Sequence, residues 1–253
     1  MTFEELKKLL LFSDSAATEA HRILSENYSD SEIYKIIERR KEGEPLSKIL
    51  GHRGFWKGDF FVDKNVLDPR ADSETLIQAV LEKFPDKTLP LRILDLGTGS
   101  GCLLISLLME YSNATGVGVD ISEKAIEIAK KNALKNMIKA EFILSDMAKL
   151  PKDLGYFDLV ISNPPYIPRK DIEALDKNVK DYDPLLALDG GEDGLDFYRI
   201  IADEVPAPIV FVEIGIGQEN QVQQIFENKN WYLWDAKKDF GGITRVLIFK
   251  KDL

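Results

Sequence analysis

The chain has little cysteine and no long apolar run. Cys102 is the single cysteine among 253 residues, which excludes an internal disulfide and fits a reducing cytoplasm. No stretch approaches the roughly 20 apolar residues of a membrane span. The apolar run at residues 9–12 is too short, and the residues before it are too charged, for a signal peptide. We therefore expect a cytoplasmic protein without a membrane partner.

Basic residues are outnumbered by acidic ones. The chain has 33 Lys and Arg against 43 Asp and Glu, a formal net charge of −10. Proteins that bind duplex DNA or RNA usually present a basic surface, so this global balance argues against nucleic acid as a partner without excluding a local basic patch. Hydrophobic residues make up 44% of the chain, enough for one sizeable core and a small accessory domain.

Metal-binding patterns are also missing. His21 and His52 are the two histidines, and neither they nor the scattered acidic residues form a recognisable ligand set. We expect no metal site and interpret both histidines as structural.

The N-terminal part has the pattern of helices. Leucine, isoleucine and alanine recur at roughly helical spacing up to about residue 44. Ser31 is placed to cap a helix that carries Ile33, Ile36 and Ile37. These residues predict a small bundle of helices.

Turn-forming residues separate this bundle from the rest of the chain. Glycines and prolines begin at residue 43, and aromatic residues flank residues 57–59, which predicts a β-hairpin. We divide the chain into a helical domain at 1–44, a linker with the hairpin at 45–70, and a second domain at 71–253.

From residue 91 onward, strand-like runs alternate with helical segments. The expected strands are 91–96, 115–120, 140–144, 158–162, 208–214, a short one near 231–235, and 244–250. This alternation predicts an α/β domain with a mostly parallel sheet covered on both faces. The short link through Gly241 and Gly242 suits an antiparallel hairpin, so we expect one antiparallel strand to close the sheet.

A glycine-rich loop follows the first of these strands. Glycines allow a tight strand-to-helix turn and a close approach of a ligand to the backbone. Dinucleotide-binding folds use similar glycines, so the loop alone does not identify the ligand. The candidate cofactor loop consists of Gly97, Thr98, Gly99, Ser100 and Gly101, and Cys102 begins the expected helix.

Carboxylates end or follow the neighbouring strands. Asp120 is placed to accept hydrogen bonds from a ribose diol, or alternatively to cap the next helix. Asp146 is placed to accept from an adenine amino group, or to form a turn, and Met147 to pack on the adenine ring or in the core. Asp95 either binds the amino group of a methionine moiety or organises the loop through its amides. The sequence leaves each pair of alternatives open.

The stretch Asn163-Pro164-Pro165-Tyr166 follows the strand run at 158–162. An amide or aromatic amine is a poor nucleophile because its lone pair is delocalised, and acceptors that fix both N–H bonds turn that lone pair toward an electrophile. The Asn163 side chain and the Pro164 carbonyl offer such acceptors, the prolines stiffen the loop, and Tyr166 can lie against a planar group.

We interpret the acceptor stretch and the glycine loop together, because each alone has another explanation. Residues 163–166 alone are also explained by an ordinary turn after a strand. The pair indicates S-adenosylmethionine-dependent methylation of an sp² nitrogen. The expected catalytic residues are Asn163, Pro164 and Tyr166. We expect Asn163, Pro164, Pro165 and Tyr166 to bind the substrate, and Asn163 also to lie beside the cofactor.

Further segments carry a family resemblance over nearly the whole chain. They are 45–51, the aromatic hairpin, 68–74, 95–101, Asp120, 163–166, 187–195, 213–215, 217–218 and 239–245. In these the chain resembles the protein-(glutamine-N5) methyltransferases of the HemK/PrmC group, which modify the glutamine of the Gly-Gly-Gln motif in peptide chain release factors. The segments 45–51, 69–74 and 187–195 are more specific to this group than the two central motifs.

The resemblance implies the class I seven-stranded, Rossmann-like methyltransferase fold, with 71–253 as the catalytic domain and 1–44 as a substrate-docking domain. It also implies S-adenosyl-L-methionine as methyl donor, S-adenosyl-L-homocysteine as product, release factors as protein substrates and a monomeric enzyme.

The sequence departs from the family pattern at a few positions. Asp68 stands where isoleucine is usual, and Ala71 and Thr244 stand where proline is common. The role of the 69–74 segment is not derivable from the sequence: Arg70 either steadies a cofactor-facing loop or forms a surface ion pair.

Three other functions compete with this interpretation. The same acceptor geometry suits a glutamine of a ribosomal protein, and it suits an exocyclic amino group of nucleic acid, which the acidic charge disfavours. A catalytically inactive binding or scaffold protein is the third, and the intact loop and Asn163 argue against it.

Overall fold

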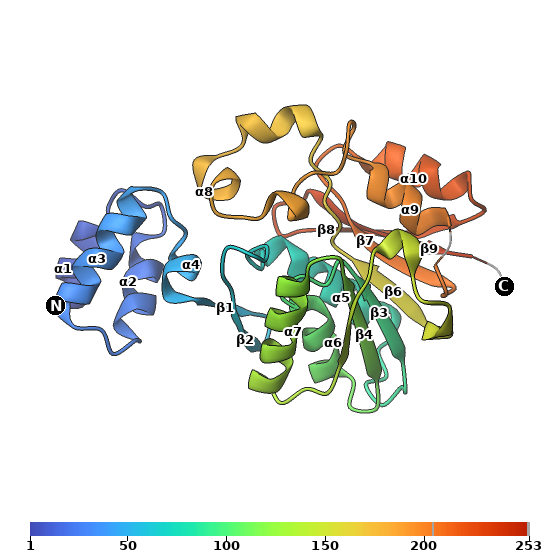
Figure 1. Cartoon of the computed structure of the whole chain (residues 1–253), viewed down its shortest axis with the longest axis horizontal. Coiled ribbons are helices and arrows are strands. Elements are labelled where there is room, and N and C mark those ends of the chain that lie inside the picture. Colours follow the sequence, from blue (N-terminus) through green and yellow to red (C-terminus); the bar gives the residue numbers. More distant parts are fainter. Residues whose placement is uncertain (204, 252–253) are drawn as a thin grey trace.

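The computed structural model describes residues 1–203 and 205–251, and its N-terminal helices form a lobe at one end of the molecule (Figure 1). They are α1 (Phe3–Leu9), α2 (Ala16–Leu24) and α3 (Asp30–Lys41). Their apolar faces form a separate hydrophobic cluster, to which Leu46 of α4 (Leu46–Leu50) contributes. The expectation of a helical bundle is confirmed, while the exact division at residue 44 stays a prediction.

The helix cap expected at Ser31 is wrong by two residues. Helix α3 begins after Ser29, whose side chain accepts from the Glu32 amide while the Glu32 carboxylate accepts from the Ser29 amide. This reciprocal arrangement satisfies two amides at the helix start, and Ser31, already inside the first turn, cannot do so.

The predicted hairpin consists of β1 (His52–Phe55) and β2 (Gly58–Phe61), which are antiparallel. It packs against α7 (Glu123–Lys135). The Asn132 side chain of α7 pairs with both backbone groups of Phe61, accepting from its amide at 2.6 Å and donating to its carbonyl at 3.1 Å. These bonds attach the linker to the sheet-bearing domain.

The central sheet has seven strands in the order β5-β4-β3-β6-β7-β9-β8. All neighbouring pairs from β5 to β7 are parallel, whereas β9 is antiparallel to both β7 and β8. The prediction of a parallel sheet closed by one antiparallel strand is confirmed. The strands are β3 (Arg92–Leu96), β4 (Thr115–Asp120), β5 (Glu141–Leu144), β6 (Leu159–Ser162), β7 (Ile209–Glu213), β8 (Tyr232–Lys238) and β9 (Thr244–Lys250).

Helices cover both faces of this sheet (Figure 1). Alternate residues of β6 show how the strands serve both cores: Leu159 and Ile161 join one hydrophobic cluster and Val160 joins the other. The first cluster packs under α5 (Glu74–Lys83), α6 (Cys102–Glu110) and α7, and the second under α9 (Asp196–Asp203) and α10 (Glu219–Glu227). This is the doubly covered arrangement expected of a parallel sheet.

Short helical segments lie between β5 and α9. They are the 3-10 turns at Met147–Lys149, Lys152–Leu154, Arg169–Ala174 and Leu185–Ala187, and the short helix α8 (Lys177–Lys180); a further 3-10 turn, Ala71–Ser73, precedes α5. Within the described residues, no helix is long and apolar enough to cross a membrane.

Candidate active site

The site lies where the carboxyl ends of three adjacent parallel strands meet. Strand β3 pairs with β4 on one side and with β6 on the other, although β6 comes three strands later in the chain. Such a reversal of strand order opens a crevice at the sheet edge, which is the usual ligand position in open α/β sheets. A cavity of about 330 Å³ lies there.

The cavity is lined by residues from the predicted motifs and by others. Of the predicted residues it is lined by Gly97, Thr98, Gly99, Ser100, Asp120, Asp146, Met147, Asn163 and Pro165. Asp95, Gly101, Pro164 and Tyr166 do not belong to its wall. The structure therefore brings most of the predicted cofactor residues together around one space.

The glycine loop is held in place by β4. The amides of Gly97 and Thr98 both donate to the Val119 carbonyl at 2.9 Å, and the Gly99 amide donates to Asp120 Oδ2 at 2.8 Å. The three loop glycines all have positive φ, between 55° and 78°, a region that other residues enter only at a cost. The loop thus has a fixed path before any ligand binds.

Asp120 has the capping role and also lines the cavity, while its contact with a ribose diol stays a prediction. Its Oδ1 accepts from the Ser122 amide at 2.9 Å at the start of α7, and its Oδ2 accepts from the Gly99 amide. Burial raises the pKa of this carboxyl, and the backbone hydrogen bonds oppose that shift. Since each carboxylate oxygen has a second lone pair, Asp120 can still accept from a ligand in the cavity that it lines.

Asp95 lies beneath the loop, away from the cavity wall. It is 1% exposed, its Oδ2 accepts from Thr98 Oγ1 at 2.6 Å, and its Oδ1 has no hydrogen-bond partner among the described residues. Burial raises its pKa to about 7, and the nearby Asp120 adds to the shift. The Thr98 bond supports the loop-organising alternative.

Asp146 and Met147 each make a structural contact and also line the cavity, while their contacts with an adenine stay predictions. Asp146 Oδ1 accepts from the Ala148 amide at 2.9 Å, which is the turn-forming role. Met147 packs against the second hydrophobic cluster, and both residues line the cavity. A structural contact and a place in the cavity wall are therefore compatible here.

Asn163 has a defined orientation. Its Nδ2 donates to Ser73 Oγ at 3.1 Å, and no hydrogen bond from the described residues reaches its Oδ1. Glu213, at the end of β7, lies behind this amide; burial raises its pKa to about 7, while hydrogen bonds from Ser73 and Asn163 oppose the shift. With its nitrogen turned to Ser73, the Asn163 side chain keeps its oxygen available as an acceptor beside the cavity.

The backbone after Asn163 is enclosed by a later segment. The Ile167 amide donates to the Leu188 carbonyl, and the Gly190 amide donates to the Ile167 carbonyl at 2.9 Å. Gln218 Nε2 donates to the Tyr166 carbonyl, also at 2.9 Å. These contacts explain why the 187–195 segment belongs with the acceptor stretch.

Tyr166 lies apart from the other predicted site residues. Its side chain lines a second, more open cavity of about 1080 Å³ together with Gly215, Gln218 and Arg245, and burial raises its pKa to about 12. The proposed contact between its ring and a substrate stays a prediction.

The sequence did not identify several cavity residues. They are Asn65, Leu67, Asp68 and Pro69 before α5, and Pro184, Leu186, Ala187 and Phe197 before and within α9, with Ser73 beside Asn163. Arg70 lines the cavity and forms an ion pair at 2.6 Å with Asp183, whose side chain is buried, so the surface pair expected from the sequence is instead a partly buried one. Its role in steadying a cofactor-facing loop stays a prediction. Only the resemblance of 68–74 and 187–195 to a family marked these regions.

The histidines take no part in the site. His21 packs on the Phe3 ring at 4.3 Å, and His52 lies between Asp59 and Glu26. Among the residues that the structure describes, no group of three or more His, Cys, Asp or Glu is arranged to hold a metal ion.

Comparison with known proteins agrees with this geometry. A family model described as a methyltransferase domain matches residues 88–190. The chain is 43% identical to the release factor glutamine methyltransferase of Agrobacterium fabrum, covering 87% of this chain and 78% of that one. It is 45% identical to the enzyme of the same name from Rhodospirillum rubrum, covering 85% and 67%. A methyltransferase structure from Pyrococcus furiosus superposes with a TM-score of 0.57 at 18% identity over 88% and 100% of the chains, which supports the fold alone.

The enclosure of the acceptor stretch predicts a specific effect of Gly194→Ala. Gly194 has a φ of +78°, and an added Cβ would lie 2.5 Å from the Tyr166 carbonyl oxygen. We expect turnover to fall by more than about tenfold because the loop must shift. The matched control is Gly242→Ala, which has a φ of +81° but no atom within 4 Å of the added Cβ. It should lose about 1 kcal/mol of stability from the positive φ alone and keep its turnover. Equal turnover in both variants would contradict the expected displacement.

The raised pKa of Asp95 predicts a pH-dependent effect of Asp95→Asn. In the folded protein this carboxyl keeps its proton up to a pKa of about 7, whereas the unfolded chain loses it near pH 4, so its contribution to stability falls as pH rises between these values. Asparagine removes this titration. We expect chemical denaturation of the ligand-free proteins to show that, between roughly pH 5.5 and pH 8, the free energy of unfolding of the variant rises by about 2 kcal/mol relative to that of the original chain. A difference independent of pH would mean that Asp95 is ionised throughout.

Proposed function

The chain belongs to the family of release factor glutamine methyltransferases, and we propose that it methylates the side-chain amide nitrogen of the glutamine in the Gly-Gly-Gln motif of peptide chain release factors. The observation that carries the proposal is the orientation of Asn163. Its nitrogen is bound by Ser73, and its oxygen is free beside the cavity lined by the glycine loop and Asp120. This orientation supports the proposal of a fixed amide acceptor next to a nucleoside-type site.

The methyl donor in this proposal is S-adenosylmethionine, which supplies an electrophilic methyl group on a sulfonium and leaves as S-adenosylhomocysteine. The cavity of about 330 Å³ is within the usual range of roughly 300–1,000 Å³ for small-molecule sites. We assign the ribose diol to Asp120, the adenine amino group to Asp146, and the adenine ring to Met147. Gly97 to Gly101 form the turn along which the rest of the cofactor lies, with Asp95 holding that turn through Thr98.

The acceptor loop positions the substrate amide. Asn163 Oδ1 accepts one of its N–H bonds and the Pro164 carbonyl accepts the other, which turns the nitrogen lone pair toward the methyl group. The rigid proline pair and the contacts to residues 188–190 keep both acceptors in place. No base is needed beforehand, because a proton leaves to water once the nitrogen carries the new methyl group. Pro165 lines the cavity and Tyr166 flanks the loop as further substrate contacts.

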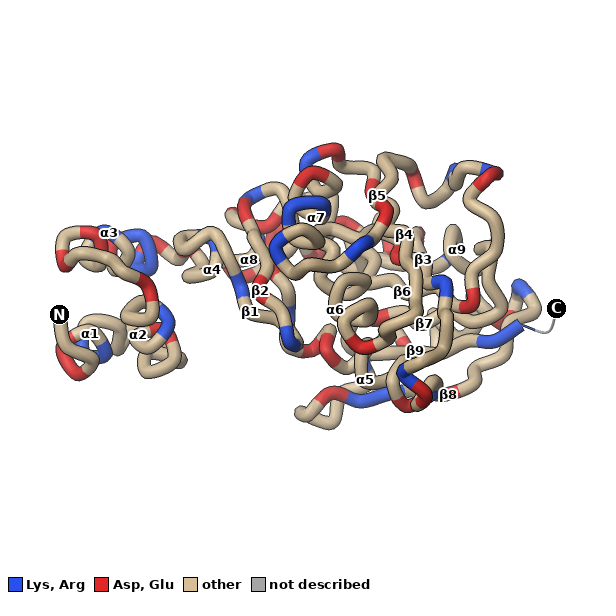
Figure 2. Tube along the Cα trace, turned by 90° about the horizontal axis from the view of Figure 1, so that it is seen from below, with Lys and Arg blue, Asp and Glu red and all other residues tan. Residues whose placement is uncertain are grey.

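Recognition of the protein substrate is assigned to residues 1–44 together with the cavity mouth. This helical lobe exposes Leu11 and Phe12, whose side chains are 71% and 47% accessible. Acidic and basic residues are interleaved along both the helical lobe and the sheet-bearing domain (Figure 2). This mixed charge fits a protein substrate, and we assign no role to nucleic acid. We further propose that the enzyme acts as a monomer, and in the cytoplasm, where its substrate works.

Mass spectrometry of intact peptides tests this function. The chain is incubated with S-adenosylmethionine and a release-factor domain, beside the same domain with the motif glutamine replaced by alanine, a ribosomal-protein fraction and total RNA. We expect one added methyl group on the glutamine peptide alone. Methyl transfer to RNA or to a ribosomal-protein glutamine, with none to the release factor, would reject the proposed substrate but would still agree with the proposed methyltransferase site.

Two substitutions separate the acceptor from the cofactor site. Asn163→Ala removes one of the two acceptors, so turnover should fall by roughly two to three powers of ten, about 3–4 kcal/mol, with cofactor affinity nearly unchanged. Asp120→Ala should instead raise the dissociation constant of the cofactor. Calorimetry with S-adenosylhomocysteine and steady-state kinetics measure the two effects. Near-normal turnover of the first variant would exclude Asn163 as the orienting group, and unchanged affinity of the second would leave Asp120 only its capping role.

A further inference from the structure

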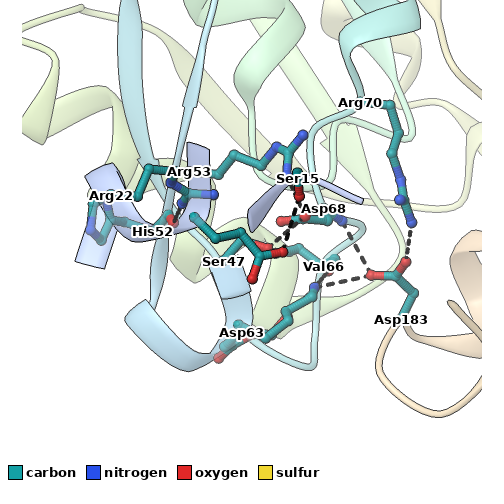
Figure 3. A network of polar contacts seen from close by, with 12 residues as sticks. Ser15, Arg22, Ser47, His52, Arg53, Asp63, Val66, Asp68, Arg70 and Asp183 are labelled. Atoms are coloured by element: carbon teal, nitrogen blue, oxygen red, sulfur yellow. Dashed lines mark hydrogen bonds and ion pairs between the residues drawn. The ribbon is translucent and has the colours of Figure 1, made fainter. Parts of the chain in front are cut away.

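A network of ion pairs and hydrogen bonds joins Asp68 and Arg70 to Asp183 (Figure 3). The Asp183 side chain is 1% exposed. Its Oδ1 is 3.1 Å from Lys48 Nζ and accepts from the Asp68 amide at 3.3 Å, while its Oδ2 accepts from Arg70 Nη2 at 2.6 Å. Both oxygens are therefore used by groups that lie more than 110 positions away in the chain.

Lys48 connects this carboxylate to the N-terminal side of the molecule. It lies on α4 and is 4% exposed, and its ammonium also donates to the carbonyls of Asp63 and Val66 at 2.7 and 2.5 Å. All three of its donors are thus occupied by two different segments. A buried ammonium of this kind requires a carboxylate partner, because an unpaired charge is costly to bury.

Asp68 extends the network to the hairpin. Its Oδ2 accepts from Ser47 Oγ at 2.6 Å, and Arg53 Nη1 lies 3.2 Å away. Ser47 precedes Lys48 on α4, and Arg53 belongs to β1. The stretch before α5 is therefore held by α4 and β1 on one side and by Asp183 on the other.

The two stretches that meet at Asp183 both line the cavity. Residues 65 and 67–70 contribute from one stretch, and Pro184, Leu186 and Ala187 from the other. Within residues 173–187, Asp183 is the only fully buried residue, and Leu185 and Leu186 are 59% and 67% exposed. Since this segment buries almost no apolar side chain, its position depends on the Asp183 contacts.

From this geometry we infer that Asp183 is a positioning residue, which holds residues 184–187 against the cofactor cavity and couples that wall to Lys48 of the N-terminal helix α4. Asp183 does not line the cavity and acts through the segment that follows it. The inference rests on the proposed function only in taking S-adenosylmethionine as the occupant of the cavity.

Asp183→Asn tests the inference, because asparagine keeps the shape of the side chain and removes its charge. We expect the dissociation constant of S-adenosylhomocysteine, measured by calorimetry on the full chain, to rise about tenfold, a usual size for coupling between sites. Turnover at saturating cofactor should stay near that of the original chain, because the Asn163 contacts are unchanged. Hydrogen exchange at amides 185–187 should become faster even without cofactor, whereas exchange in the sheet should not.

Further variants separate positioning from general stability. Lys48→Gln perturbs the network from α4 without touching the cavity, and should shift affinity and exchange in the same direction if Asp183→Asn folds poorly. Asp183→Glu keeps the charge and should restore most of the affinity. The control is Glu173→Gln, which breaks an exposed ion pair with Lys180 in the same segment and should change neither readout.

The outcomes distinguish this inference from the proposed function. Unchanged affinity in both network variants, or weaker binding without faster exchange at amides 185–187, would overturn the role of Asp183. If the original chain methylates no release factor while the variants still show the expected affinity and exchange, only the proposed substrate fails.

Discussion

The site depends on the pairing of β3 with a parallel strand on each side. Because β4 and β6 run in the same direction as β3, the glycine loop, Asp120 and Asn163 all leave the sheet at one edge. The β4 backbone then fixes the loop, since the Val119 carbonyl accepts from two loop amides and the Asp120 carboxylate from a third. The proposed cofactor and acceptor sites are thus placed by the same hydrogen-bond register, and a shift of β4 or β6 relative to β3 would separate them.

Segments outside the sheet complete the site through hydrogen bonds to Asn163 and to the backbone that follows it. Residues 188–190 form bonds with the stretch after Asn163, Gln218 binds the Tyr166 carbonyl, and Ser73 orients the Asn163 amide. None of these groups needs to touch a ligand for its contact to matter. In the proposed mechanism, their common effect is that Asn163 Oδ1 is aimed before the substrate arrives, so little ordering cost remains for binding.

The sequence predicted the fold well because each strand is a short apolar run that ends at a turn signal. All predicted strands from 91–96 to 244–250 are present within a few residues. The glycine loop and Asp120 were predictable because they directly follow strands. The sequence could not show that Asp120 and Asp146 combine a structural bond with a place in the cavity wall, since one side chain has more acceptor capacity than one role requires. Ser73 and Asn163 are 90 positions apart, and no local pattern joins them.

Buried carboxylates near the cavity differ in whether a basic side chain is available to pair with them. Asp183 has Lys48 and Arg70 as partners, whereas Asp95 has only a hydroxyl, and its pKa is correspondingly raised to about 7. For Glu213, the nearby Arg245 is already bound by Asp72 and Asp239 at 2.9 Å.

The difference follows from position. Asp95 lies beneath the glycine loop, where it accepts from Thr98 Oγ1 and has no basic partner, so burial favours its protonated form. Asp183 instead meets Lys48 and Arg70, and this pairing offsets the cost of burying its charge. Asp95 therefore avoids an unpaired buried charge by keeping its proton up to a pKa of about 7, whereas Asp183 avoids it through its ion pairs.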